Sequence, residues 1–273
     1  MTIFYFKDSR SFPQGEQLKK HILQTGCYSE NVNLQIYNKY FTCSRPRDLL
    51  FNAIDTRYGF SSGTVCDAGC EYGMHLARCA PGSYGIEIER YSFDFAKSIG
   101  LTVYNRNIVE DDLSDLPRVD AVWTVATMEH TDAPHIFLRK LYHLLKPNGL
   151  LIVEVPVRRG PPLRWLGLLP ISFLRGLYIE DHADHVNAFT PLTLRHFCEL
   201  AGFKTIEVFM WSVLLVNNIP SIPLFLTKYL PLNMLANDGV YIGRKIPDWD
   251  YPTRAARRSA DNRKGFEYVE RIP

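Results

Sequence analysis

A short glycine-containing stretch has residue types and spacing that suit a nucleotide-like or carboxylate-bearing ligand. Residues 64–66 are typical of a buried strand, Asp67 ends that strand, and Gly69 and Gly73 follow it. Glycine lets the backbone turn tightly and approach a ligand closely. A helical pattern predicted to begin at Met74 would add the free N–H groups of a helix N-terminus, which favour anions. An ordinary strand-to-helix turn is the alternative interpretation.

A second acidic residue stands where ribose-binding carboxylates occur in nucleotide-binding α/β folds. Residues 83–87 have the pattern of a strand that ends in Glu87, about 20 residues after Asp67. The two oxygens of a carboxylate at that place suit the paired hydroxyls of a ribose. The alternative is a solvated charge at the end of a strand.

These residues are positioned by a regular alternation of strand and helix patterns. Strands are predicted at 64–67, 83–87, 101–104, 121–125, 150–155, 205–211 and 239–244, and helices at 90–98, 132–145 and 191–201. Such alternation predicts an α/β fold with a seven-stranded, mostly parallel sheet and helices on both faces. The last strand is predicted to be antiparallel, because no clear crossover helix precedes it.

Several segments lie outside this alternation. The expected units are an N-terminal helical extension (1–60) with helices at 16–23 and 47–54, a main domain (61–245) with two apolar inserts (160–184 and 217–236), and a basic tail (246–273). Inserts over the carboxyl edge of a sheet commonly act as lids, and we expect this role for the inserts. Packing against the core or against a second copy of the chain is the alternative. In the extension, the rings of Tyr37, Tyr40 and Phe41 are expected to cover the core, and closing a lid over the ligand is their alternative role.

The composition excludes several classes of function. The chain has 31 Lys and Arg against 29 Asp and Glu, and a net charge of +2 gives no indication of nucleic-acid binding. Its six cysteines include no pair at the C-x-x-C spacing of zinc sites, and we expect reduced thiols in a cytoplasmic protein. Prolines interrupt the apolar stretches, so no membrane-spanning helix is expected.

Five groups of residues then match motifs of one family in the expected order. The matching stretches are 65–73 (D-x-G-C-G-x-G), 85–87, 120–123 with 128–130 (a strand motif ending in Glu-His), 144–149 (Leu-Lys-Pro-Gly-Gly), and 185–190 with 201–203. Over about residues 60–245 the chain resembles class I S-adenosylmethionine-dependent methyltransferases, above all ubiquinone-biosynthesis-type O-methyltransferases. The resemblance implies a Rossmann-like sheet and an enzyme that methylates a small molecule.

Two positions in turns depart from the pattern of that family. Glu71 replaces the middle glycine of the first motif, so its side chain must point away from the ligand or the turn must shift. Asn148 replaces a glycine of the Lys-Pro-Gly-Gly turn, and asparagine tolerates a left-handed backbone.

A third departure concerns metals. Relatives with an E-x-x-E-H metal arrangement have an acid where this chain has Ala126. A site built from Glu129, His130 and His135 would therefore lack one ligand, and we predict that no metal is bound.

The resemblance implies S-adenosylmethionine as the cofactor and assigns residues to its site. They lie at or just after the carboxyl ends of strands, where ligands bind in open α/β sheets: Asp67, Gly69, Cys70, Gly73, Glu87, Asn107, Ile108, Thr124 and Val125.

Individual roles follow for five of these residues. The N–H groups around Gly69 would receive the methionyl carboxylate, Asp67 the ammonium group, and Glu87 the ribose hydroxyls. The resemblance gives Asn107 a hydrogen bond to the adenine amine and lets Ile108 pack on the adenine ring. A turn-forming role is the alternative for Asn107.

The acceptor is predicted to be a small molecule with a hydroxyl, partly apolar and either quinone-like, lipid-linked or glycan-type. A histidine base suits such chemistry, and the candidates are His185 first and His130 second, with His182 also near the cleft. Each of them also suits a structural role. The apolar insert 160–184 leaves contact with a lipid surface open, and the oligomeric state is not predicted.

Two other functions compete with methyl transfer. A nicotinamide-dependent oxidoreductase would need G-x-G-x-x-G, which Gly69 and Gly73 with Glu71 between them do not supply. A non-catalytic scaffold with the same fold is the second alternative, although it would not need to keep Asp67 and Glu87.

Overall fold

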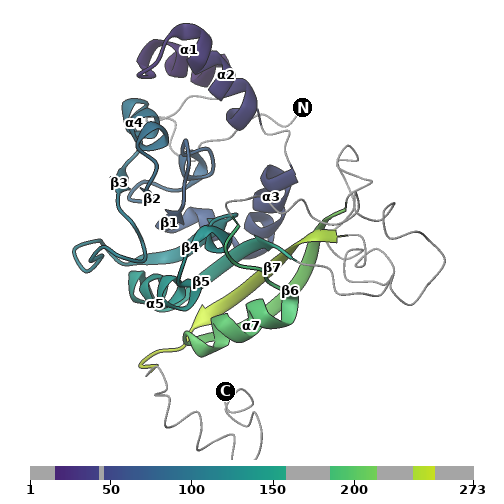
Figure 1. Cartoon of the computed structure of the whole chain (residues 1–273). Helices are drawn as coiled ribbons and strands as arrows, with labels where there is room; N and C mark the ends of the chain where they lie inside the picture. Colours follow the sequence, from purple (N-terminus) through teal and green to yellow (C-terminus); the bar gives the residue numbers. More distant parts are fainter. Residues whose placement is uncertain (1–15, 43–45, 158–184, 214–235, 250–273) are drawn as a thin grey trace, which may run out of the picture.

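The computed structural model describes residues 16–42, 46–157, 185–213 and 236–249 of the chain. A seven-stranded sheet forms its centre, with the strand order β3-β2-β1-β4-β5-β7-β6 (Figure 1). The strands are β1 (Val65–Ala68), β2 (Tyr84–Glu87), β3 (Val103–Asn105), β4 (Val119–Val125), β5 (Leu145–Pro156), β6 (Phe203–Val213) and β7 (Ala236–Lys245).

Strand directions confirm the predicted topology. β1 is parallel to β2 and β4, β2 is parallel to β3, and β4 is parallel to β5. β7, the last strand in the sequence, lies between β5 and β6 and is antiparallel to both. The carboxyl ends of β1, β2, β4 and β5 therefore share one edge of the sheet, where ligands bind in open α/β folds.

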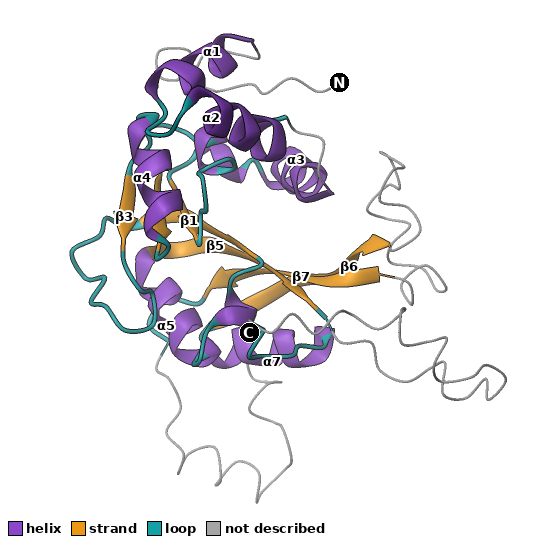
Figure 2. Ribbon diagram, turned by 45° about the horizontal axis from the view of Figure 1, so that its top comes forward, coloured by secondary structure: helices purple, strands orange, loops and turns teal. Residues whose placement is uncertain are grey.

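Helices cover both faces of the sheet, as expected. Figure 2 shows α3 and α4 on one face, with α1 and α2 beyond them, and α5 and α7 on the other face. The α-helices are α1 (Glu16–Thr25), α2 (Glu30–Ile36), α3 (Pro46–Tyr58), α4 (Arg90–Ser98), α5 (Pro134–Leu144) and α7 (Pro191–Leu200). The short helical turns are η1 (Tyr37–Phe41), η2 (Phe60–Ser62), η3 (Leu76–Arg78) and η4 (Met128–His130).

Alternate residues of the central strands face opposite layers, because successive side chains of a strand point to opposite faces. Ala121 and Trp123 of β4 pack in the cluster that includes Phe51 of α3. Val122, between them, packs with Leu141 of α5. The two layers together bury β4 and β5, which explains their nearly continuous apolar sequence.

The N-terminal helices pack on the main domain. Tyr40 and Phe41 of η1 are buried in a cluster with Phe95 of α4. The ring of Tyr40 also lies 4.7 Å from that of Tyr72. These rings cover the core in the structure, which is the role expected for them.

The helical pattern predicted to begin at Met74 forms only a short helical turn. Only η3 forms there, and its three residues end just before Pro81 and Gly82. Proline lacks the backbone N–H that a continuing helix needs, and glycine favours a turn. The extended helix N-terminus expected to bind an anion is therefore not present.

Some expectations concern segments outside the described residues. The whole insert 160–184, which includes His182, lies outside them, as do residues 217–235 of the second insert and the tail from residue 250. Among the described helices, none is long and apolar enough to cross a membrane.

Candidate functional site

The turn after β1 is built around Gly69. Its backbone φ is 78°, in the left-handed region that favours glycine. The N–H groups of Gly69 and Cys70 both donate to the carbonyl oxygen of Ile86, at 2.9 and 3.2 Å. A Cβ atom on Gly69 would lie 2.3 Å from Oγ1 of Thr127. Gly69 therefore lets the turn pack against the end of β4, but bonds within the protein already engage the N–H groups expected to bind a carboxylate.

Asp67, at the end of β1, has an oxygen that suits a cationic ligand. The residue is 3% exposed, and its Oδ2 has no hydrogen-bond partner among the described residues. Burial raises the pKa of Asp67 to about 8, and the charges of Glu87 and Glu71 add to this rise, while a backbone hydrogen bond from Leu76 opposes it. An unpaired buried carboxylate costs stability, and an ammonium group at Oδ2 would offset that cost.

Glu87 ends β2 with its carboxylate held by the backbone. Its Oε1 accepts the N–H of Glu89 at 2.8 Å, and its Oε2 accepts the N–H of Glu71 at 2.7 Å. Burial raises the pKa of Glu87, whereas these two N–H groups lower it. Each oxygen keeps a second lone pair for a further donor. The carboxylate is therefore fixed in place and can still accept hydrogen bonds from two hydroxyl groups.

Glu71 shows how the chain replaces the usual middle glycine. Its φ is 50°, which is left-handed, and its side chain is exposed. The side chain therefore points to solvent, which is the first of the two outcomes expected for this position.

Asn107 forms a turn in the structure. Its Oδ1 accepts the N–H of Val109 at 2.9 Å, and its own N–H donates to Oδ2 of Asp111 at 2.7 Å. Ile108 is 7% exposed and belongs to the main core cluster. These contacts favour the turn-forming interpretation of Asn107, and its contact with adenine stays a prediction.

Asn105 is a residue that the sequence reasoning did not single out. Its side-chain amide donates to the carbonyl oxygens of Glu87 and Ile88, at 2.8 and 3.0 Å. It therefore fixes the chain just where β2 ends. The signal that could have identified it is its position, because Asn105 directly follows the predicted strand 101–104; in the structure it pairs with Glu87 across β2 and β3.

The remaining predicted cofactor residues shape the site in different ways. A Cβ on Gly85 would lie 2.4 Å from Sγ of Cys70, so the Cys70 side chain points into the core. A Cβ on Gly73 would lie 2.2 Å from Leu101, so Gly73 serves close packing. Thr124 is 1% exposed with no partner for its Oγ1 among the described residues, and Val125 is half-buried beside it.

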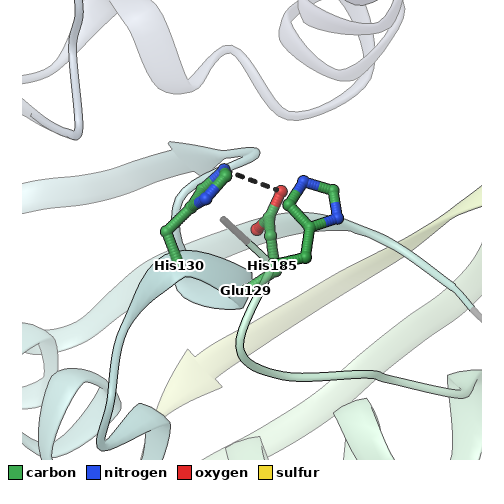
Figure 3. A group of neighbouring side chains, drawn as sticks. All are labelled: Glu129, His130 and His185. Atoms are coloured by element: carbon green, nitrogen blue, oxygen red, sulfur yellow. Dashed lines mark ion pairs between the residues drawn. The ribbon is translucent and has the colours of Figure 1, made fainter. Parts of the chain in front are cut away.

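A second group of side chains lies beyond the carboxyl end of β4 (Figure 3). Glu129 and His130 come from η4, and His185 comes from the segment that leads to α7. Nε2 of His130 lies 3.8 Å from Oε1 of Glu129, and the rings of His130 and His185 are 4.7 Å apart. The N–H of Asn187 donates to the carbonyl oxygen of Glu129 at 3.0 Å, which joins the two segments.

The carboxylate of Glu129 is the most buried part of this group. The residue is fully buried, and neither of its carboxylate oxygens has a hydrogen-bond partner among the described residues. Burial raises the pKa of Glu129 to about 8, with Glu154 adding to the rise and Arg47 opposing it. A carboxyl group with a raised pKa beside two imidazoles suits proton transfer.

The same three side chains also have the composition of a cation site. Glu129, His130 and His185 each offer one ligand atom, and these atoms lie within 4.8 Å of one another. The site considered from the sequence combined Glu129 and His130 with His135, whereas the structure places His185 beside them. That juxtaposition was hidden because His185 is distant in the sequence.

An ion pair between a partly exposed arginine and a buried glutamate was also missed. Glu154 of β5 is 1% exposed, and its Oε2 lies 3.7 Å from Nε of Arg47 on α3. A single carboxylate in an otherwise apolar buried strand is the signal that could have identified Glu154.

Comparison with known proteins gives consistent results. A family model described as a methyltransferase domain matches residues 35–208. A ubiquinone biosynthesis O-methyltransferase of Pseudomonas savastanoi pv. phaseolicola is 24% identical over 169 residues, which are 59% of this chain and 72% of that protein.

Solved structures share the fold at lower identity. A SAM-dependent methyltransferase from Archaeoglobus fulgidus aligns with a TM-score of 0.53 and 18% identity, over 77% of this chain and 98% of that one. The [4+2]-cyclase SpnF aligns with a TM-score of 0.51 and 16% identity, over 72% and 80%. Since a protein named a cyclase shares this fold, the fold alone does not determine the reaction.

Proposed function

Because this chain belongs to the methyltransferase-domain family and is an S-adenosylmethionine-dependent enzyme, we propose that it methylates a hydroxyl group on a partly apolar small molecule. The observation that carries the choice of a hydroxyl is the buried carboxylate of Glu129 between two imidazoles. A hydroxyl must lose a proton when it is methylated, and this group can accept one. The Pseudomonas relative is named an O-methyltransferase of ubiquinone biosynthesis, which supports oxygen as the attacking atom and a quinone-like acceptor.

Two acids are proposed to hold the cofactor. The free Oδ2 of Asp67 would accept a hydrogen bond from its ammonium group, and the fixed carboxylate of Glu87 would accept bonds from its ribose hydroxyls. When bound, S-adenosylmethionine supplies a methyl group on a positively charged sulfur for direct displacement. The protein contributes by holding and orienting the reactants.

The proton of the acceptor is proposed to pass to an imidazole. A ring nitrogen of His185 or Nε2 of His130 would take it, and the nearby Glu129 carboxylate, when ionised, would stabilise the resulting imidazolium. No step of this scheme needs a metal. Treatment of the enzyme with EDTA should therefore leave the activity unchanged, and loss of activity that Mn²⁺ or Zn²⁺ restores would show that the three side chains bind a cation instead.

The acceptor atom can be tested with a matched pair of compounds. The enzyme would be incubated with S-adenosylmethionine labelled with ¹³C in its methyl group, and with either a long-chain alkyl catechol or the corresponding alkyl aniline. The ¹³C chemical shift of the product separates O-methyl from N-methyl. Methyl transfer to the catechol alone supports the proposal. Transfer to the aniline alone, or transfer to neither compound, would overturn it.

A further inference from the structure

A strained turn lies between β4 and η4. Ala126 has a φ of 48°, the left-handed conformation that residues with a Cβ atom rarely adopt. It follows β4 directly and stands between Val125 and Thr127, at the edge of the sheet that carries the site. Such a conformation persists only where surrounding contacts enforce it.

Glu154 supplies those contacts from the neighbouring strand. The N–H of Ala126 donates to the backbone carbonyl oxygen of Glu154 at 3.0 Å and also to its Oε2 at 3.1 Å. Glu154 is 1% exposed, so water does not compete for these bonds. One residue of β5 thus holds the turn with both its backbone and its side chain.

The conformation of Ala126 places Thr127 against the turn after β1. Oγ1 of Thr127 donates to the carbonyl oxygen of Val125 at 3.0 Å and lies 3.3 Å from that of Ala68. Oγ1 and the methyl group of Thr127 fill the space where a Cβ of Gly69 would lie. A shift of Ala126 would therefore move the wall against which the turn after β1 packs.

Arg47 connects this arrangement to the N-terminal helix α3. Its Nε lies 3.7 Å from Oε2 of Glu154, the same oxygen that accepts the N–H of Ala126. Burial raises the pKa of Glu154, whereas the charge of Arg47 and the hydrogen bond from Ala126 lower it. Arg47 thus favours the ionised carboxylate, which is the stronger hydrogen-bond acceptor.

We propose that Glu154, supported by Arg47, is a positioning residue of the cofactor site, because it holds Ala126 in its strained conformation and thereby fixes Thr127 against Gly69. This inference rests on the proposed function in that it takes the turn after β1 as the cofactor site. It assigns to β5 and α3 a part in cofactor affinity, although neither Glu154 nor Arg47 needs to contact the cofactor.

Glycine at position 126 separates this role from a general structural one, because glycine adopts a left-handed conformation without strain. Glu154→Leu should weaken the binding of S-adenosylhomocysteine by about tenfold, since the left-handed alanine then loses the bond to the side chain and keeps only the bond to the backbone carbonyl of residue 154. Adding Ala126→Gly to this variant should restore most of the affinity. Calorimetric titration gives the dissociation constants, and thermal unfolding of each variant gives its stability.

Two further variants complete the test. Glu199→Leu is the control, because Glu199 is also a buried acid paired with an arginine, Arg195, but lies on α7 away from the turn. This variant should have a lower unfolding temperature and an unchanged affinity for S-adenosylhomocysteine. Arg47→Gln should weaken binding by about threefold and be rescued by Ala126→Gly, and it serves if Glu154→Leu does not fold.

The possible results separate a failure of the positioning role from a failure of the proposed function. If wild-type protein binds S-adenosylhomocysteine but neither Glu154→Leu nor Arg47→Gln weakens binding, the positioning role is wrong and the cofactor site stands. Weaker binding that Ala126→Gly does not restore would also overturn it. If the folded wild-type protein does not bind S-adenosylhomocysteine, the proposed function itself is wrong.

Discussion

The backbone N–H of Glu71 donates a 2.7 Å hydrogen bond to Oε2 of Glu87. This bond closes the turn after β1 over the end of β2, and Glu71 makes it from a left-handed conformation. Burial is the main cause that raises the pKa of Asp67 and of Glu87, and the negative charge of Glu71 adds to the rise in both. The residue that replaces a glycine in this turn therefore acts on both acids of the site.

Glu71→Gln tests that electrostatic effect, because it keeps the backbone bond and removes the charge. The pKa of both acids should fall, and S-adenosylhomocysteine should bind about two- to threefold more tightly at pH 7 as the carboxylates become more ionised. Calorimetric titration measures the change. Glu110→Gln, which alters an exposed acid, is the control. Weaker binding by Glu71→Gln would contradict the prediction.

The raised pKa of Asp67 predicts a dependence of stability on pH. Its folded pKa of about 8 lies above the unfolded value, so its stabilising contribution is full below about pH 4 and is lost as the pH rises to about 8. Asp67→Asn should remove part of this loss, and at pH 8 it should be more stable than the wild type by about 1–3 kcal/mol. Urea unfolding at pH 5 and pH 8 compares the two proteins. If the wild type and Asp67→Asn lose the same free energy of unfolding between pH 5 and pH 8, Asp67 is already ionised in the folded protein at the lower pH.

The two histidines beside Glu129 should affect the turnover rate rather than cofactor affinity. His185→Gln and His130→Gln are each expected to lower kcat by about 100-fold if the imidazole accepts the acceptor proton. S-adenosylhomocysteine should bind both variants as it binds the wild type. His143→Gln, an exposed histidine of α5, is the matched control. A fall in kcat for neither variant would exclude both imidazoles as the base.

A buried hydrogen bond joins Trp123 of β4 to His75 within the core. Nε1 of Trp123 donates to Nδ1 of His75 at 3.1 Å, and Phe60 stacks on the indole. Trp123→Phe should lower the free energy of unfolding by about 1–3 kcal/mol, because it removes the donor and leaves a small cavity. Trp211→Phe provides the contrast. Its Nε1 has no partner among the described residues, so denaturant unfolding should find this change nearly neutral.

Much of the fold could be predicted because its signals are local. The helix α7 begins at Pro191 as expected, and Thr190 caps it through the N–H of Thr193 at 3.1 Å. The apolar run of β5 indicated a central strand, and seven successive residues of β5, from Gly149 to Val155, are buried. Asn148 takes the left-handed conformation foreseen for it, with a φ of 60°.

The contacts that complete the site could not be predicted in the same way. His185 meets Glu129, and Arg47 meets Glu154, between segments that are far apart in the sequence. Neither pairing leaves a periodic pattern in the sequence, because it arises only when the sheet brings the segments to one edge. The N–H of Gly69 is engaged by Ile86 for the same reason, since β2 supplies the acceptor.

The most direct test of the central claim is calorimetric titration of S-adenosylhomocysteine into the wild-type protein and Glu87→Ala. We expect micromolar binding by the wild type, about −8 kcal/mol. The variant should bind at least about tenfold more weakly, because it lacks the proposed ribose acceptor. The absence of binding to folded wild-type protein would contradict the assignment of this site. Equal affinity of the two proteins would contradict the role of Glu87.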